Sequence, residues 1–287
     1  MRSIRLGALA VALLLAFAQP VAAVGPGRSG GHAPVYYLSV GDSLAAGVQP
    51  IGDPANMYRT NDGYADQLYA IAKSRFPNLV LVKLGCPGET TGTMIAGGIC
   101  DYHHGSQLDE AVAFLHAHHR FVAFVTIDIG SNDFPCQTGL SCLPPGVASI
   151  QANLPTILGA LRKAAGPGVP IVGATIYDPF LGAWLTGPDG RAFAELTVFG
   201  AIVPLNQMLT GIYGAAGMPV ADIEGAFSTT DFVTTVPLPP FGDVPLNVVR
   251  ICQWTWICAP PPLGPNNHAN AAGYRAMAEA FEAVLLP

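Results

Sequence analysis

Four short segments carry groups that could together perform acyl transfer. Ser43 lies in GDSLAAG, Gly88 in LGCPGETTGTM, Asn132 in IGSNDF and His268 in GPNNHANAAGY. Cleavage of an ester through an acyl-serine needs a nucleophile, a base that takes its proton, and hydrogen-bond donors aimed at the oxyanion. Ser43 and His268 can supply the nucleophile and the base. The Ser43 and Gly88 backbone N–H groups and the Asn132 side-chain amide can supply the donors.

Each of these residues, taken alone, has an ordinary structural interpretation. A serine at the end of a strand usually caps the helix that follows. Gly88 by itself would be a turn glycine, and Asn132 by itself would close its own turn. The hypothesis of a shared site therefore depends on elements that bring all four residues together.

Those elements alternate between short apolar, β-branched segments and longer amphipathic ones. Strands are expected at 35–40, 79–85, 121–130, 169–177 and 218–224. Helices are expected at 63–76, 107–119, 147–165, 198–216 and 270–285, with Pro155 marking a kink or a late start of the third. The alternation predicts an α/β fold: a three-layer α/β/α sandwich with a mostly parallel, flavodoxin-like central sheet. Loops that follow parallel strands lie along one edge of such a sheet, where ligands bind.

The four segments, in this order, resemble the SGNH, or GDSL, hydrolase family. GDSL matches the first family block, GETT the second, GSND the third and HANAAGY the last, so the resemblance runs from Val35 to the C-terminus. It implies a secreted serine ester hydrolase, an esterase or lipase that works through an acyl-serine without a cofactor. The implied roles are Ser43 as nucleophile, His268 as base, and Ser43, Gly88 and Asn132 as the oxyanion hole.

The chain departs from the family pattern at the third member of the catalytic triad. The family's last block has an aspartate, two residues and then the histidine, and the aspartate position is Pro265 in this chain. No aspartate or glutamate lies between Asp243 and Glu279. The missing acid would normally fix the histidine tautomer and stabilise the imidazolium.

A neutral acceptor can orient the histidine in place of the acid. We predict a Ser43–His268 dyad in which the Pro265 carbonyl oxygen accepts the Nδ1–H bond, because proline keeps its C=O. The side-chain oxygen of Asn266 or Asn267 is the alternative acceptor. Capping or turn formation before the last helix is the ordinary interpretation of these two asparagines.

The N-terminal segment predicts export. Arg2 and Arg5 precede an apolar run, and PVAA then offers small residues for cleavage after Ala23, so residues 1–23 read as a secretory signal peptide. A retained N-terminal anchor is the alternative. Residues 24–34 are expected to form a flexible linker, and residues 35–287 a single domain.

The charge balance argues against nucleic acid as a partner. The chain has 13 Lys and Arg against 19 Asp and Glu, a net charge of −6, and signal cleavage would remove two of the arginines. Binding to phosphate backbones needs a basic face. The expected partner is a small-molecule or lipid ester, with transient contact with lipid surfaces, and a monomer is expected.

Six cysteines follow one another as three close pairs. Fifteen connectivities are possible, and nearest-neighbour pairing is the simplest because each pair brackets a Gly/Pro-rich or polar loop and export supplies oxidising conditions. The expected disulfides are Cys86–Cys100, Cys136–Cys142 and Cys252–Cys258. The last of these closes part of 225–267, a proline-rich segment expected to form a long functional loop.

Two further groups of residues have competing interpretations. Trp254 and Trp256 lie in the last cysteine loop and could line an apolar acyl pocket, or could equally be core residues beneath the loop. Five histidines lack the spacing of a metal-ligand pair, so no metal site is predicted. These are His103, His104, His116, His118 and His119.

Other functions remain open from the sequence. A carbohydrate acetylesterase or a phospholipase would use the same chemistry. A secreted binding protein that kept the fold and lost the acid would use none of it, although it would have no need for all four residues.

Overall fold

The computed structural model describes residues 33–50, 57–134 and 141–286, and Ala33–Pro287 form one compact unit. Within the described residues the main sheet has five strands in the order β4-β1-β5-β6-β7, and every neighbouring pair is parallel. Counted along the chain, this is the 2-1-3-4-5 order of flavodoxin-like sheets. The strands are β1 (Val35–Gly41), β4 (Leu79–Lys83), β5 (Val122–Asp128), β6 (Ile171–Ala174) and β7 (Val220–Ala221).

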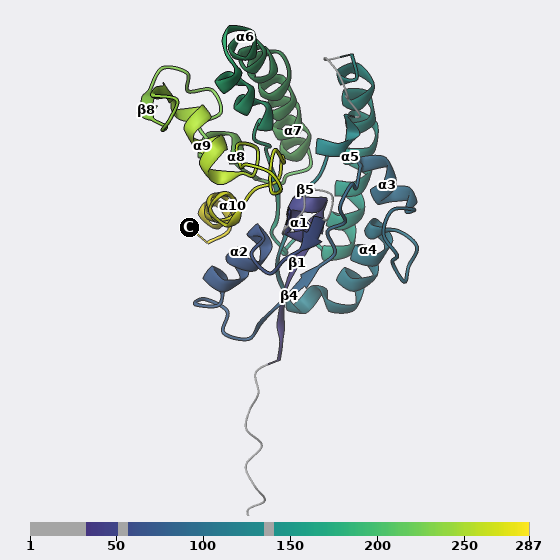
Figure 1. Cartoon of the computed structure of the whole chain (residues 1–287). Coiled ribbons are helices and arrows are strands. Elements are labelled where there is room, and N and C mark those ends of the chain that lie inside the picture. The colour runs from purple at the N-terminus through teal and green to yellow at the C-terminus, as the bar shows by residue number, and fades with distance from the viewer. Residues whose placement is uncertain (1–32, 51–56, 135–140, 287) are drawn as a thin grey trace, which may run out of the picture. The chain divides into compact units, whose positions relative to one another are not determined.

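Helices cover both faces of this sheet, which confirms the predicted three-layer class (Figure 1). Successive residues of β1 point to opposite faces, as the pleat requires. Tyr37 is buried in a core that α2 and α10 complete, and Leu38 in a core that α4, α5 and α7 complete. The bounds of these helices are α2 (Tyr64–Ala72), α10 (Ala271–Leu285), α4 (Gln107–His118), α5 (Leu143–Ala165) and α7 (Val203–Ala215).

The third predicted helix is longer than expected. α5 begins at Leu143 and continues through Pro155. Proline removes one intrahelical hydrogen bond, but the buried side chains of Leu154 and Leu158 flank it and anchor the helix on the sheet. Tertiary packing therefore outweighs the local preference.

Between β6 and α7 lies a helical region of which the sequence pattern predicted only the last part, from Val198 onward. It consists of a 3₁₀ segment, η3 (Pro179–Thr186), then α6 (Pro188–Thr197) and a π-helical segment, η4 (Val198–Ile202). The stretch Pro188–Ala215 is long and apolar enough to cross a membrane by length and composition. Leu205 and Leu209 of this stretch are buried against the sheet, so we interpret it as part of the globular fold.

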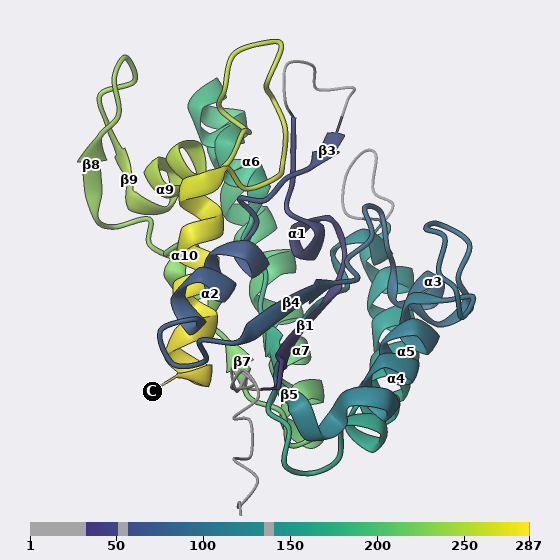
Figure 2. The ribbon, with the colours of Figure 1, turned by 90° about the horizontal axis from the view of Figure 1, so that it is seen from below.

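The segment 225–267 is not the long loop that was expected. It contains the end of α8 (Ile223–Ala226), the β8–β9 hairpin (Thr235–Pro237 and Asp243–Pro245) and α9 (Leu246–Trp254). Figure 2 shows the hairpin beside α9. The expectation failed because prolines interrupt the pattern, while α9 is held by the burial of Val248 and Ile251.

The remaining elements are short. They are α1 (Ser43–Ala46), α3 (Thr91–Ala96), the β2–β3 pair (Val48–Pro50 and Met57–Arg59), η1 (His119–Phe121) and η2 (Ser131–Asp133). The Cys86–Cys100 and Cys252–Cys258 disulfides are present. Cys136 lies outside the described residues, as do the predicted signal peptide and all of the predicted linker except its last two residues.

Candidate active site

Ser43 is the first residue of α1, directly after the carboxyl end of β1. Asp42 caps this short helix, because its carboxylate accepts a 2.9 Å hydrogen bond from the Leu44 N–H. The first N–H groups of a helix have no intrahelical partner. The Ser43 N–H is therefore placed to donate toward a bound group.

The turn that aims Ser43 outward depends on Gly41. Its φ is 138°, and a Cβ atom there would overlap the backbone oxygen of Asp128. Gln107, at the start of α4, holds this turn from the other side. Its Oε1 accepts from the Gly41 N–H at 2.6 Å, and its Nε2 donates to the Gly41 oxygen at 2.9 Å. Nothing in the sequence pattern marked Gln107, because the contact spans 66 residues.

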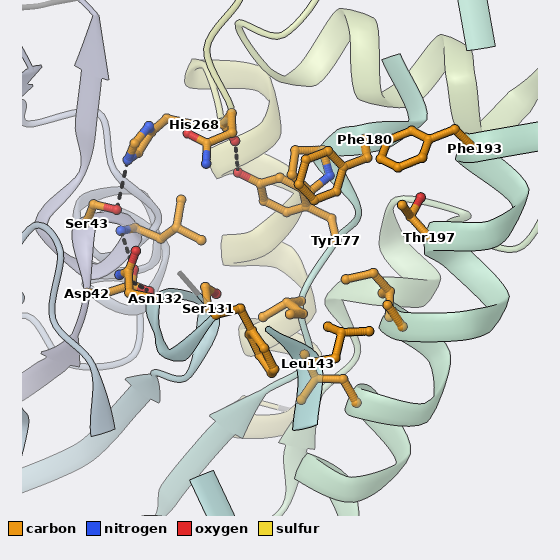
Figure 3. A pocket seen from close by; sticks show the side chains of 18 residues that line it. Asp42, Ser43, Ser131, Asn132, Leu143, Tyr177, Phe180, Phe193, Thr197 and His268 are labelled. Atoms are coloured by element: carbon orange, nitrogen blue, oxygen red, sulfur yellow. Dashed lines mark hydrogen bonds between the residues drawn. The ribbon is translucent and has the colours of Figure 1, made fainter. Parts of the chain in front are cut away.

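The structure brings Ser43 and His268 together across 225 residues of chain. Their Oγ and Nε2 atoms are 2.8 Å apart, which is hydrogen-bond distance (Figure 3). Backbone contacts with residues 255 and 256 hold the segment that carries His268. Its carbonyl oxygen accepts from the Trp256 N–H at 3.0 Å, and Thr255 forms a bridge with Ala269.

The acceptor next to the other ring nitrogen is Asn266 and not Pro265. Asn266 Oδ1 is 2.9 Å from His268 Nδ1 and also accepts from the His268 backbone N–H at 3.0 Å. The physical reason is a turn in which an Asn side chain bonds the backbone two residues on, which brings the same oxygen to the ring. Because Oδ1 only accepts, Nδ1 carries the proton and the Nε2 lone pair faces Ser43. The prediction for the Pro265 carbonyl was wrong, and the alternative acceptor takes its place.

Burial changes the acidity of the imidazole. His268 is half-buried, and desolvation of its charged form lowers its pKa from 6.5 to about 4. No carboxylate contributes to this shift. The ring is therefore neutral, and able to accept a proton, over most of the pH range.

Of the two predicted oxyanion-hole loops, that of Asn132 lines the same cavity as Ser43, and that of Gly88 is joined to it through the neighbouring Glu89. Asn132 Nδ2 donates to the Glu89 oxygen at 3.0 Å and to Asp42 Oδ2 at 3.4 Å, which orients the amide. Gly88 has a φ of 83°, and the space beside its Cα is open. Asp133 ties the two loops together by accepting from the Thr91 N–H at 2.9 Å and the Thr91 hydroxyl at 2.6 Å.

A cavity of about 360 Å³ opens beside Ser43 and His268. Figure 3 shows Tyr177, Phe180 and Phe193 on the side opposite the dyad. The wall is mostly apolar, and much of it comes from η3, α6 and η4. Its apolar residues are Leu44, Phe134, Leu143, Ile176, Tyr177, Pro179, Phe180, Phe193, Ala201, Ile202 and Leu205. The apolar run PFLGAWL after the fourth strand was the signal that could have revealed this wall.

Neither tryptophan lines this cavity, so of the two interpretations of Trp254 and Trp256 the acyl pocket does not hold, and Trp254 packs against the core. Trp254 packs edge-on against Phe227, with ring centroids 5.2 Å apart. Trp256 donates from its indole to Gln49 at 3.3 Å. Because both residues lie behind the His268 segment, they support it and do not contact the cavity.

The described histidines do not form a metal centre. Within residues 33–50, 57–134 and 141–286, no group of three or more His, Cys, Asp or Glu side chains could hold a metal ion. His104 instead contacts Glu110 at 2.8 Å between Nδ1 and Oε2.

A serine at the end of the first strand, paired with a histidine before the last helix and flanked by glycine and asparagine loops, defines a serine hydrolase of the SGNH class. A model of the GDSL-like Lipase/Acylhydrolase family matches residues 39–276, and the chain belongs to this family. It is a carboxylic ester hydrolase.

Solved structures share the fold at low sequence identity. An acetylxylan esterase from Geobacillus stearothermophilus is 16% identical, with a TM-score of 0.54 over 88% of this chain and 94% of that one. An extracellular lipase from Streptomyces rimosus is 19% identical, with a TM-score of 0.53 over 87% of this chain and 99% of that one. No curated protein sequence matches the chain.

Proposed function

We propose that this chain is a secreted serine esterase that cleaves esters of apolar carboxylic acids through an acyl-Ser43 intermediate. The observation that carries the proposal is the 2.8 Å contact between Ser43 Oγ and His268 Nε2 at the mouth of an apolar cavity. Asn266 orients the base in place of an acid. The substrate is a small-molecule or lipid ester.

The chemical steps follow from the positions of these groups. His268 Nε2 takes the hydroxyl proton as Ser43 Oγ attacks the ester carbonyl carbon. The Ser43 and Gly88 N–H groups and the Asn132 amide donate to the oxyanion of the tetrahedral intermediate. The imidazolium then gives its proton to the leaving alcohol, and a water molecule, activated by the same histidine, hydrolyses the acyl-serine.

The cavity favours an apolar acyl group. An acetyl group would leave most of about 360 Å³ unfilled, whereas each buried methylene of a longer chain contributes about 0.8 kcal/mol. This argues for esters with longer acyl chains over acetylated carbohydrates, although an acetylxylan esterase shares the fold.

Hydrolysis of nitrophenyl esters of graded chain length tests the proposal. We expect kcat/KM to rise from acetate to medium-chain esters and the Ser43→Ala variant to be inactive on all of them. A fluorophosphonate should label Ser43 in the folded wild type. Failure to label would favour a binding protein, and a preference for acetate on a sugar would favour a carbohydrate acetylesterase.

Narrowing the cavity should shorten the preferred acyl chain. Ala201 lines the cavity from η4, so Ala201→Phe is expected to lower kcat/KM for octanoate by about 10-fold or more while leaving acetate nearly unchanged, since only the longer chain loses burial. Ala117→Phe, on an exposed position of α4, is the control. Equal losses on both esters would contradict the assignment of the cavity to the acyl group.

The pH profile should show a base with a lowered pKa. Because His268 acts as the neutral imidazole and burial lowers its pKa to about 4, the final acid fall of kcat/KM is expected near that pH and not near 6.5. Asn266→Asp would place a carboxylate against Nδ1, stabilise the imidazolium and move this fall to higher pH.

The control for this charge is Asn267→Asp, one residue further on, where the side chain is exposed and water screens the added carboxylate. It should shift the profile less. An acid fall that stays in place in Asn266→Asp would contradict the assignment of His268 as the base.

Secretion is supported by two disulfides, which persist in oxidising compartments. The N-terminal sequence pattern of residues 1–23 points the same way. Mass spectrometry of the secreted chain should find its new N-terminus near Val24, after cleavage at Ala23.

A further inference from the structure

A pair of buried carboxyl groups lies directly behind the nucleophile. Asp42 and Asp128 are 2% and 4% exposed, and the Asp42 N–H donates to the Asp128 backbone oxygen at 3.1 Å, which holds the two residues side by side. None of the ion pairs formed by the described residues involves either group. Two adjacent carboxylates without a counter-ion cannot both stay ionised.

The hydrogen bonds show which group carries the remaining proton. Asp42 receives two donors, the Leu44 N–H at Oδ1 and the Asn132 amide at Oδ2. Asp128 receives the Tyr64 hydroxyl at Oδ1, at 2.7 Å, whereas its buried Oδ2 has no donor. An unsatisfied buried carboxylate oxygen is costly. A proton on this oxygen turns it into a donor and satisfies it.

We infer that Asp42 and Asp128 share one proton, held by Asp128, and that neutral Asp128 is a positioning residue for the oxyanion hole. Its O–H donates to the Asp42 carboxylate. The Asp42 anion in turn holds the Asn132 amide and the first turn of α1, which carries Ser43. The inference rests on the proposed function in one respect, the role of Asn132 as an oxyanion donor.

Burial also favours a proton on this pair, because it raises the pKa of both carboxyl groups. It raises the pKa of Asp128 well above its ordinary value, with the charge of Asp42 adding to the effect. It raises the pKa of Asp42 to about 6, partly offset by the Leu44 N–H. The pair is therefore expected to hold one proton at neutral pH and to take up a second near pH 6.

The other titratable groups around the pair are neutral phenols or carboxyl groups. Tyr37 and Tyr64 stay protonated because burial raises their pKa. Glu89 is 1% exposed, one of its oxygens lacks a donor, and burial raises its pKa. Asp133 differs, because donors fill both of its oxygens. Glu89 is thus a second candidate for a protonated buried carboxyl group. Asp133, a buried carboxylate whose oxygens all have donors, is the matched control.

Infrared spectroscopy at pH 7 tests the shared proton independently of activity. Wild type should show the C=O stretch of a buried protonated carboxyl group. Asp128→Asn should lose that component, whereas Asp133→Asn should keep it and Glu89→Gln should remove at most a separate one. A wild-type spectrum without the band, or a band that Glu89→Gln removes entirely, would overturn the inference.

Kinetics of the same pair test the positioning role. Asparagine at 128 can accept from Tyr64 and donate to Asp42, so the kcat of Asp128→Asn should stay within about 3-fold of wild type. Alanine can make neither hydrogen bond, so the kcat of Asp128→Ala should fall by more than this. Asp42→Asn still caps α1 but loses the anion. It should lower kcat about 10- to 100-fold with KM little changed, as for a charge-assisted hydrogen bond.

The pH profile adds a readout that a purely structural role would not move. Wild-type kcat/KM should show a partial fall near pH 6, where Asp42 takes up its proton, and Asp42→Asn should lack it. The positioning role would be overturned if Asp42→Asn had the same kcat as wild type, or if Asp42→Asn and Asp128→Asn lowered kcat equally. The proposed function would still stand if Ser43→Ala were inactive. Should Asp42→Asn fail to fold, the infrared comparison still decides on the proton.

Discussion

Replacing Ser43 or His268 by alanine is expected to lower kcat by on the order of 10⁴- to 10⁶-fold, and replacing both should cost little more than replacing one. The two side chains act as a unit, because their 2.8 Å contact passes a single proton. Without the base the hydroxyl is a poor nucleophile, and without the hydroxyl the base has nothing to activate. The residual rate acceleration of these variants should come from substrate binding and the oxyanion donors.

The measurement is kcat on a medium-chain nitrophenyl ester for both single variants and the double variant. Ser131→Ala is the matched control, because this serine also lines the cavity but forms no hydrogen bond with His268. Losses that multiply in the double variant would show that the two residues act separately, and an active Ser43→Ala variant would remove the basis of the proposed mechanism.

The second large effect is expected at Asn132, where alanine should lower kcat by about 10²- to 10³-fold, or roughly 2.7–4 kcal/mol. The amide is already oriented by the Glu89 oxygen and Asp42. These two contacts use both N–H groups, so the N–H that makes the longer, 3.4 Å contact with Asp42 must turn toward the charge that develops on the substrate oxygen. Because the ground-state carbonyl carries less charge, KM should change little.

Asn267→Ala is the control for this variant, since Asn267 also lines the cavity and contributes its backbone oxygen to Tyr177. A rise in KM with kcat intact would assign Asn132 to substrate binding and not to the transition state. Thermal unfolding of both variants checks that the fold is retained.

Several features of the fold were predictable because their signals are local. The buried strands ending at Gly41 and Asp128 are continuous apolar runs, and the helices that flank them show apolar residues three and four apart. Parallel connections place the loops after these strands along one edge. This is why Ser43 and His268 could be predicted to meet although 225 residues separate them.

The Pro265 prediction and the acyl-pocket interpretation of the two tryptophans failed for different reasons, the first through a local turn and the second through neighbours that are distant in sequence. Pro265 occupied the place of the family's acid, yet a turn brings the Asn266 oxygen to the ring. Trp254 and Trp256 were near His268 in the chain, yet they face the core and Gln49.

Periodicity and four short segments were enough to predict the class of protein, the order of the strands, and Ser43 and His268 as the candidate nucleophile and base. Only the folded chain shows which residues form the wall of the cavity and which buried acids lie behind Ser43. Those features depend on packing across the sheet, where Gln107 holds Gly41 and the Asp128 backbone oxygen accepts from the Asp42 N–H. Such contacts produce no periodic pattern in the sequence, so they cannot be predicted from it.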